Sequence, residues 1–226
     1  MSAPKILVVD DEQSLRQFLE IFLEKEGYEV DTAASRPSGL KAARVYKPDL
    51  IVLDIMLPGM DGIEVLTQLR RESDAYVIML TAKSEEVDKV VGLSVGADDY
   101  VTKPFSPREL TARVKAALRR LRSSASAGEM LAFRHVRIDV GARQVWLDDQ
   151  PVELTAIEFD LLKTLAENRG RVLTREQLLE KVWGGTYFGE LRVVDVHLGH
   201  VRQKLGGEYF IVTVRGVGYR FEDELI

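Results

Sequence analysis

The sequence has no cysteine, no long apolar segment and no excess of positive charge. Without cysteine the chain has no disulfide framework, thiolate zinc site or cysteine nucleophile. Asp, Lys or Pro interrupts every hydrophobic run, so no segment approaches the ~18 apolar residues of a membrane-spanning helix. No signal-peptide pattern opens the chain. We therefore expect a cytoplasmic protein with no membrane partner.

The balance of charge is slightly acidic, with 31 Lys and Arg against 36 Asp and Glu and a net charge of −5. By itself this balance argues against nucleic-acid binding, because nucleic-acid-binding proteins are usually basic. The 226 residues, 46% hydrophobic and 30% charged, are typical of a globular chain with one large domain or two ordinary ones.

One segment has the composition of a linker. Residues 123–128 read Ser-Ser-Ala-Ser-Ala-Gly, without a large apolar side chain, and they follow a strongly helical stretch. This predicts a first domain over 1–122, a linker over 123–128 and a second domain over 129–226.

The first half alternates short apolar runs with helical patterns. An apolar stripe at Leu15, Phe18, Leu19, Phe22 and Leu23 predicts a helix that ends near Gly27. The runs that favour strands are rich in β-branched and aromatic residues. They are 6–9, 28–30, 50–53, 76–80 and 100–101. Five β-then-α units indicate an α/β domain with a doubly wound, five-stranded parallel sheet.

The second half has a different pattern. Short strands are predicted over 133–139, 144–148 and 152–154, with turns at Gly141 and at 148–149. Thr155 with Glu158, and Thr174 with Gln177, have the spacing of capping boxes that begin helices. A third helix is expected over about 191–205, with Leu191, Val194, Leu198, Val201 and Leu205 buried, before a hairpin over 209–221. This order describes a smaller α+β winged-helix domain.

Acidic residues end two strands of the predicted parallel sheet. Asp10, Asp11 and Glu12 follow the first strand, and Asp54 follows the third. Thr81 ends the fourth strand and Lys103 ends the fifth. Strand ends of a parallel sheet meet at one edge, so we expect these side chains to converge. Crowded carboxylates without His or Cys favour Mg²⁺. A cation, an ammonium and a hydroxyl suit phosphoryl transfer to Asp54 as the nucleophile.

Four motifs of the first half resemble the receiver domain of two-component response regulators. They are Val-Asp-Asp-Glu (9–12), Leu-Asp-Ile-Met-Leu-Pro-Gly-Met-Asp-Gly (53–62), Leu-Thr-Ala-Lys (80–83) and Gly-Ala-Asp-Asp-Tyr-Val-Thr-Lys-Pro-Phe (96–105). The second half is similar to the winged-helix output domain of the OmpR/PhoB subfamily. Its motifs are Leu-Thr-x-x-Glu-Phe-x-Leu-Leu (154–162), Val-Trp-Gly (182–184), Val-Asp-Val-His (194–197) and Thr-Val-Arg-Gly-Val-Gly-Tyr (213–219).

The resemblance implies a transcription factor that accepts phosphate from a sensor histidine kinase in a phosphorelay. Asp54 would be phosphorylated, with Lys103 and Thr81 as catalytic groups. Mg²⁺ would be held by Asp10 through water, and by Asp11, Asp54 and the Met56 carbonyl. Thr81 and Tyr100 would form a switch, and the 103–104 bond would be cis, as bonds before proline sometimes are. Taken alone, Thr81 and Tyr100 are an ordinary strand end and a half-buried aromatic residue.

The resemblance also implies that phosphorylation promotes a homodimer. The expected charge pairs are Lys89 with Glu109, Asp99 with Arg113, and Asp98 with Arg119 or Arg120, around Val90, Leu93 and Ala112. Taken singly, such exposed charges contribute only ~0–1 kcal/mol. Complementary signs at a two-fold interface favour the functional interpretation.

By the same resemblance, the third helix and the hairpin bind double-stranded DNA. The expected surface is Arg192, Asp195, Val196, His200 and Arg202, with His197 on phosphate and Thr213 and Arg215 in the minor groove. His197 and His200 alone would be ordinary helix histidines. Residues 191–220 carry five basic and two acidic side chains, so positive charge gathers there. Gly199 and His200 replace frequent arginines, so binding should depend weakly on salt and require paired half-sites.

Two other functions fit part of the pattern. A Mg²⁺-dependent phosphatase with an aspartyl nucleophile shares the chemistry, but haloacid dehalogenases carry that nucleophile after their first strand. No lid or cap is evident, so we expect no turnover of an external substrate. A phosphorylation-controlled adaptor that has lost DNA contact is the other alternative. Residues 184–190 either meet RNA polymerase, as in the family, or simply connect helices.

Overall fold

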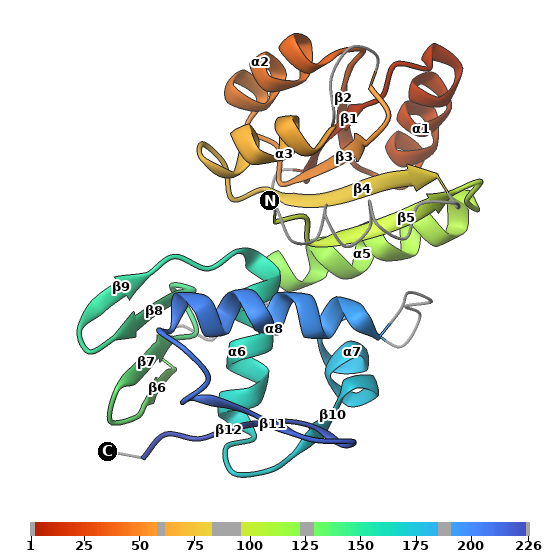
Figure 1. Cartoon of the computed structure of the whole chain (residues 1–226). Coiled ribbons are helices and arrows are strands. Elements are labelled where there is room, and N and C mark those ends of the chain that lie inside the picture. The colour runs from red at the N-terminus through yellow and green to blue at the C-terminus, as the bar shows by residue number, and fades with distance from the viewer. Residues whose placement is uncertain (1–2, 58–61, 83–95, 123–128, 185–190, 225–226) are drawn as a thin grey trace. The chain divides into compact units, whose positions relative to one another are not determined.

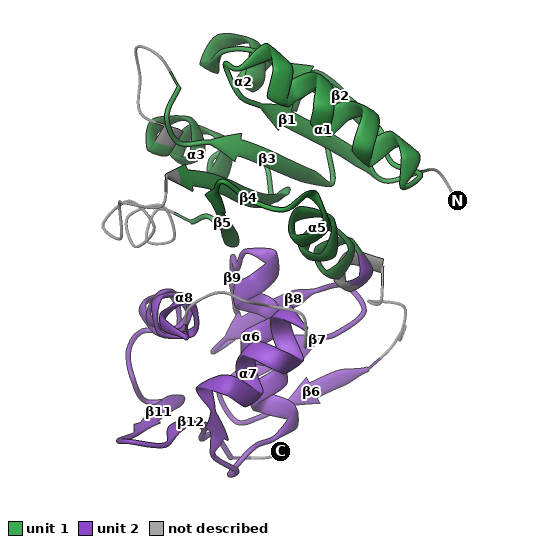
Figure 2. Cartoon of the chain, turned by 90° about the vertical axis from the view of Figure 1, so that its right-hand side faces the viewer, with its two compact units in different colours: residues 1–118 green, residues 119–226 purple. Residues whose placement is uncertain are grey.

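The computed structural model describes residues 3–57, 62–82, 96–122, 129–184 and 191–224. Within these ranges the chain divides into two compact units, 1–118 and 119–226, which Figure 2 colours separately. The division falls inside a helix, four residues before the expected domain end at 122. The expected linker, 123–128, lies outside the described residues.

The first unit is built on a five-stranded sheet. The strands are β1 (Lys5–Val9), β2 (Glu29–Ala33), β3 (Leu50–Asp54), β4 (Tyr76–Ala82) and β5 (Asp99–Lys103). Their order is β2-β1-β3-β4-β5, and every neighbouring pair is parallel. The prediction of a doubly wound parallel sheet is confirmed.

Helices cover both faces of this sheet (Figure 1). They are α1 (Gln13–Lys25), α2 (Arg36–Tyr46), α3 (Gly62–Arg70) and α5 (Pro107–Arg122). Between β4 and β5, residues 83–95 lie outside the described part of the chain. Strand β3 and residues 6–9 of β1 are buried throughout, as expected for central parallel strands with both faces covered.

Local signals in the sequence explain where α1 ends and which of its faces is buried. Gly27 follows the helix with φ of +89°, a backbone conformation that favours glycine, and its amide donates to the Glu24 carbonyl. Leu19 and Leu23 are buried, whereas Phe18 of the predicted apolar stripe is 44% exposed and stacks on Phe22. The apolar stripe is therefore wider than the face that the sheet covers.

The second unit begins with an antiparallel meander. Its strands are β6 (Met130–Ala132), β7 (Val136–Asp139), β8 (Gln144–Leu147) and β9 (Gln150–Val152). Within the predicted strand over 133–139 only β7 forms a strand, β6 precedes it as a separate strand, and the last strand covers 150–152 where 152–154 was predicted. Asp148 and Asp149 both have positive φ, which closes the tight turn between β8 and β9.

Three helices and a second small sheet complete this unit. They are α6 (Ala156–Glu167), β10 (Leu173–Thr174), α7 (Arg175–Trp183), α8 (Arg192–Lys204), β11 (Ile211–Val214) and β12 (Gly218–Phe221). Both predicted capping boxes are present, at Thr155 with Glu158 and at Thr174 with Gln177. The core forms around Phe159, Leu162 and Phe221. These elements form the expected winged helix.

One predicted core position of α8 is wrong. Leu191 is 37% exposed, because it lies at the N-cap of the helix and not within its buried stripe. Val194, Leu198, Val201 and Leu205 are buried as expected. No helix among the described residues is both long and apolar enough to span a membrane.

Candidate functional site

Three charged side chains meet where the strands of the first unit end. Asp10 directly follows β1, Asp54 is the last residue of β3, and Lys103 is the last residue of β5. The Lys103 ammonium lies 2.9 Å from Asp10 Oδ2 and 2.8 Å from Asp54 Oδ2. Asp10 and Asp54, which precede Lys103 by 93 and 49 positions in the sequence, thus pair with the same ammonium, as the parallel topology predicts.

Burial sets the electrostatics of this site. Asp10 is fully buried and Asp54 is 4% exposed. Burial raises the pKa of Asp54, aided by the charge of Asp10 and opposed by hydrogen bonds from Lys103 and the Met56 amide. Burial lowers the pKa of Lys103, but its hydrogen bonds to Asp54 and Asp10 outweigh burial and raise the pKa overall. The ammonium therefore stays charged at neutral pH.

The carboxylates fit a hard divalent cation. Oxygens of Asp10, Asp11 and Asp54 lie within 4.8 Å of one another, and Asp11 is exposed beside its two buried neighbours. An all-oxygen donor set of this kind suits Mg²⁺. The Met56 amide donates to Asp54 Oδ1 at 3.0 Å, which orients that carboxylate. The Glu12 amide donates to Asp10 Oδ1 at 2.8 Å and orients that carboxylate in the same way.

Thr81 and Tyr100 lie on adjacent strands near this cluster. Thr81 is 1% exposed, and its Oγ1 has no hydrogen-bond partner among the described residues. A buried hydroxyl without a partner costs roughly 1–3 kcal/mol, so an incoming oxygen atom would relieve an existing penalty. Tyr100 is buried, at 6% exposure. The bond between Lys103 and Pro104 is cis, as predicted.

In the second unit, α8 and the β11–β12 hairpin carry exposed polar and basic groups. Arg192, Gly199 and Gln203 are exposed on α8, and Val196 and His200 are half-buried beside them. Thr213 and Arg215 are exposed on the hairpin. A helix with slim or polar exposed residues next to a basic hairpin is typical of a major-groove reader with a wing.

The two units match two family models. Residues 6–115 match the response regulator receiver domain, and residues 149–221 match the C-terminal domain of transcriptional regulatory proteins. The chain is 47% identical to the alkaline phosphatase synthesis transcriptional regulatory protein PhoP of Bacillus subtilis, over 97% of both chains. It is 46% identical to the sensory transduction protein RegX3 of Mycolicibacterium smegmatis, over 96% of this chain and 98% of that protein.

Solved structures agree over almost the whole chain. A RitR mutant has a TM-score of 0.77 and 33% identity, covering 97% of this chain and 99% of its own. DrrB, an OmpR/PhoB homologue of Thermotoga maritima, has a TM-score of 0.52 and 34% identity with the same coverage. The chain belongs to the OmpR/PhoB response regulators. It is a response regulator transcription factor with a receiver domain and a winged-helix output domain.

One residue expected on the dimer face of this response regulator is buried. Asp98 is fully buried, and its Oδ2 accepts hydrogen bonds from Arg70 and, at 2.8 Å, from the Val77 amide. Arg70 also donates to the carbonyls of Gly96 and Ala75. The expected pairing of Asp98 with Arg119 or Arg120 is therefore wrong. Arg70 lies 28 positions away, and no local pattern in the sequence marks it as the partner.

The other expected dimer residues divide into two groups. Asp99, Arg113 and Glu109 form an ion-pair chain within one molecule, with Arg113 at 2.9 Å from each carboxylate. Ala112 is half-buried on the same helix. Lys89, Val90 and Leu93 lie outside the described residues, so their place in a dimer stays a prediction.

Two residues expected to face DNA instead join the recognition helix α8 to the wing. Arg202 donates to the Ile211 carbonyl at 2.8 Å and to Thr213 Oγ1 at 2.6 Å. Asp195 Oδ1 accepts from Tyr219 Oη at 2.6 Å and from Arg175 Nε at 2.7 Å. The Tyr219 ring also lies near both guanidinium groups. No pattern in the sequence marks Arg175, because the network is assembled from α7, α8 and the β11–β12 hairpin.

His197 is not on the surface where its predicted phosphate contact requires it. Its side chain is 1% exposed, and its ring centroid lies 5.8 Å from that of Trp183 on α7. The resemblance implies a phosphate contact for His197, whereas the structure places its imidazole against the neighbouring helix α7. A buried ring in that position does not reach DNA, so the predicted contact is wrong for this structure.

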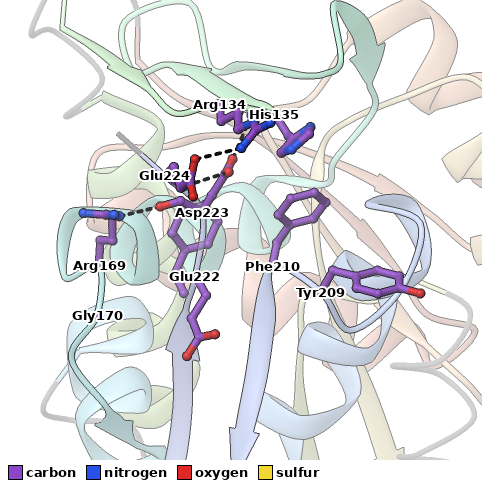
Figure 3. Close-up of a pocket in the computed structure, with 10 residues that line it drawn as sticks. Arg134, His135, Arg169, Gly170, Tyr209, Phe210, Glu222, Asp223 and Glu224 are labelled. Atoms are coloured by element: carbon purple, nitrogen blue, oxygen red, sulfur yellow. Dashed lines mark hydrogen bonds and ion pairs between the residues drawn. The ribbon is translucent and has the colours of Figure 1, made fainter. Parts of the chain in front are cut away.

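A separate hollow of about 540 Å³ lies where the C-terminal segment meets the turn between β6 and β7 (Figure 3). Arg134 pairs with Glu224 at 2.9 Å, and Asp223 accepts from the amides of His135 and Val136. Arg169 donates to the Asp223 carbonyl. These contacts fasten the end of the chain to the meander, which is a structural role.

Proposed function

We propose that Asp54 accepts a phosphoryl group from a sensor histidine kinase, and that the modified protein dimerises and binds tandem promoter half-sites. The observation that carries the proposal is the convergence of Asp10, Asp54 and Lys103 at the ends of three strands. Two buried carboxylates share this one ammonium, and the negative charge that is left uncompensated is costly, which favours a chemical role for the cluster.

The groups of the pocket have complementary parts in this reaction. An Asp54 oxygen forms a bond to phosphorus while the bond from phosphorus to the donor nitrogen breaks, and the nitrogen keeps the electron pair. Lys103, 2.8 Å from Asp54, is placed to pair with an oxygen of the transferred group, and Thr81 is placed to donate its unpartnered hydroxyl. Asp10, Asp11 and Asp54 would hold Mg²⁺, which neutralises developing charge on phosphoryl oxygens when bound.

The second unit is the proposed readout. Arg192, Val196 and His200 on α8 would read the major groove, while Thr213 and Arg215 on the hairpin would enter the minor groove. Asp195 and Arg202 would act through the wing that they hold in place. Because Gly199 carries no charge, one copy should bind weakly and two copies on adjacent half-sites should supply the affinity.

Labelling with acetyl phosphate in Mg²⁺ tests the chemistry. Intact-mass measurement should find one added phosphoryl group per chain, and none in Asp54→Ala. Asp74→Ala is the matched control, because Asp74 is an exposed carboxylate of the same unit and should leave the labelling unchanged. Equal labelling of the wild type and Asp54→Ala would overturn the proposal.

The same preparation separates the alternatives. A phosphatase would release inorganic phosphate from small phosphomonoesters over many turnovers, whereas the regulator should stop after one self-modification. An adaptor would accept phosphate but retard no duplex in gel shifts against randomised DNA. We expect a retarded complex that strengthens on phosphorylation. RNA polymerase contact through residues 184–190 remains part of the proposal.

A further inference from the structure

A second cluster of possible metal ligands lies in the winged-helix unit. Glu158 is on α6, and His197 and His200 are three positions apart on α8. One ligand atom from each of the three lies within 4.8 Å of the others. The chain has three histidines, and two of them lie beside this one buried carboxylate.

The two oxygens of Glu158 face different partners. Oε2 accepts from the Thr155 amide at 2.9 Å and from the Lys204 ammonium at 2.7 Å. Oε1 lies 3.5 Å from His200 Nδ1, on the side of the histidines. Burial raises the pKa of this carboxyl, but His200 and Lys204 more than offset it and bring the pKa to about 2. Glu158 is thus a charged ligand at neutral pH.

We propose that Glu158, His197 and His200 bind a divalent transition-metal ion of the Zn²⁺ class. Two imidazole nitrogens and one carboxylate oxygen are a frequent protein donor set for Zn²⁺ and Co²⁺, with water completing the coordination. This set differs in kind from the all-oxygen cluster of Asp10, Asp11 and Asp54, which suits Mg²⁺. One chain therefore offers two sites with opposite preferences.

The position of the cluster gives the ion a consequence. It joins the recognition helix α8 to α6, a helix whose apolar face is buried in the core of this unit. His200 is half-buried on the recognition helix, so a bound ion fixes a side chain beside the proposed DNA surface. Lys204 competes with the metal ion, because its ammonium is also positively charged and already pairs with the Glu158 carboxylate.

Cobalt titration of the full-length protein tests the site directly. Excess Mg²⁺ is present throughout to occupy the all-oxygen cluster. We expect visible d–d absorption that saturates at one Co²⁺ per chain and disappears when Zn²⁺ is added. Trp183 lies 5.8 Å from His197, so its fluorescence should be quenched in a Trp146→Phe background, where it is the remaining tryptophan.

Three variants distinguish a metal site from an ordinary ion-pair network. His200→Ala removes one ligand and should weaken Co²⁺ binding at least about tenfold. His135→Ala, which removes the histidine outside the cluster, should leave binding unchanged. Lys204→Met removes the competing ammonium and should tighten binding about tenfold. Absence of the absorption band, equal losses in the two histidine variants, or unchanged binding in Lys204→Met would each overturn the proposal.

Discussion

Asp54 and Lys103 hold opposite charges at a site where the Asp54 carboxylate is buried and Lys103 is partly exposed. Burial raises the pKa of the Asp54 carboxyl, and the Lys103 ammonium 2.8 Å away lowers it in part. The poorly solvated carboxylate is oriented by the Met56 amide and Lys103. The chemistry of this response regulator therefore depends on the burial of individual side chains as much as on their identity.

The buried hydroxyl of Thr81 lowers the stability of the fold but is used in the proposed reaction. Thr81→Val replaces a buried hydroxyl that has no hydrogen-bond partner among the described residues with a methyl group of similar size. We expect the unfolding free energy to rise by about 1 kcal/mol, because the desolvation penalty of the hydroxyl is removed. The rate of labelling by acetyl phosphate should fall, because a donor to the phosphoryl group is lost.

Chemical denaturation and a labelling time course measure the two effects on the same preparation. Thr32→Val, on the edge strand β2 of the same sheet, is a control that should not slow labelling. A less stable Thr81→Val variant would contradict the account of the unpartnered hydroxyl.

The winged-helix elements depend on two close approaches between chain segments. Arg202 and Asp195 fasten α8 to the hairpin, and Gly218 lets β12 pass directly against β10. A Cβ built on Gly218 would lie 2.0 Å from the Leu173 carbonyl oxygen. The wing therefore keeps its place through backbone contact as well as through side chains.

A pair of glycine substitutions tests this packing. Gly218→Ala should destabilise the second unit by several kcal/mol, since backbone atoms must move to admit the methyl group. Gly199→Ala, within α8, should instead stabilise it by about 0.5–1 kcal/mol, because an added Cβ meets no described atom within 4 Å and alanine favours helix. Urea unfolding followed by tryptophan fluorescence compares the two, because Trp146 and Trp183 both lie in this unit. Similar destabilisation in both variants would contradict the assignment.

For the whole molecule, the distribution of charge matters more than its sum. The net charge is −5, yet residues 191–220 carry five basic and two acidic side chains. Phosphorylation adds about −1.5 to −2 charge to a receiver that is already acidic, so its effect must come from a shift between conformers. In the proposed function, one modified residue acts on DNA through a surface that differs between those conformers and that pairs with a second copy.

Phosphorylation should therefore change the oligomeric state. Addition of beryllofluoride with Mg²⁺ should raise the mass measured by light scattering from monomer toward dimer, while Asp54→Ala should remain monomeric under the same conditions. Asp74→Ala should behave as the wild type does. A mass that stays monomeric for the wild type would rule out phosphorylation-driven pairing.

Much of the fold was predictable because short segments of the sequence determine its strands and helix ends. Buried parallel strands appear as continuous apolar runs, and the capping boxes at Thr155 and Thr174 appear at fixed spacing. The convergence of Asp10, Asp54 and Lys103 was also predictable, because the topology of a parallel sheet brings strand ends to one edge. Periodicity was a weaker guide at Leu191, which lies at the N-cap outside the buried stripe of α8, and at Phe18, where the apolar stripe of α1 is wider than the surface that covers it.

The sequence alone determined the family, the two kinds of domain and the residues of the acidic pocket, since these depend on motifs whose members are close in the chain or ordered by the sheet. Only the tertiary structure decided that Asp98 pairs with Arg70, that His197 is buried, and that Arg202 and Asp195 hold the wing. Each of these depends on which side chain arrives from a distant element. Local periodicity specifies the face on which a residue lies, but the packing of other elements determines what it meets there.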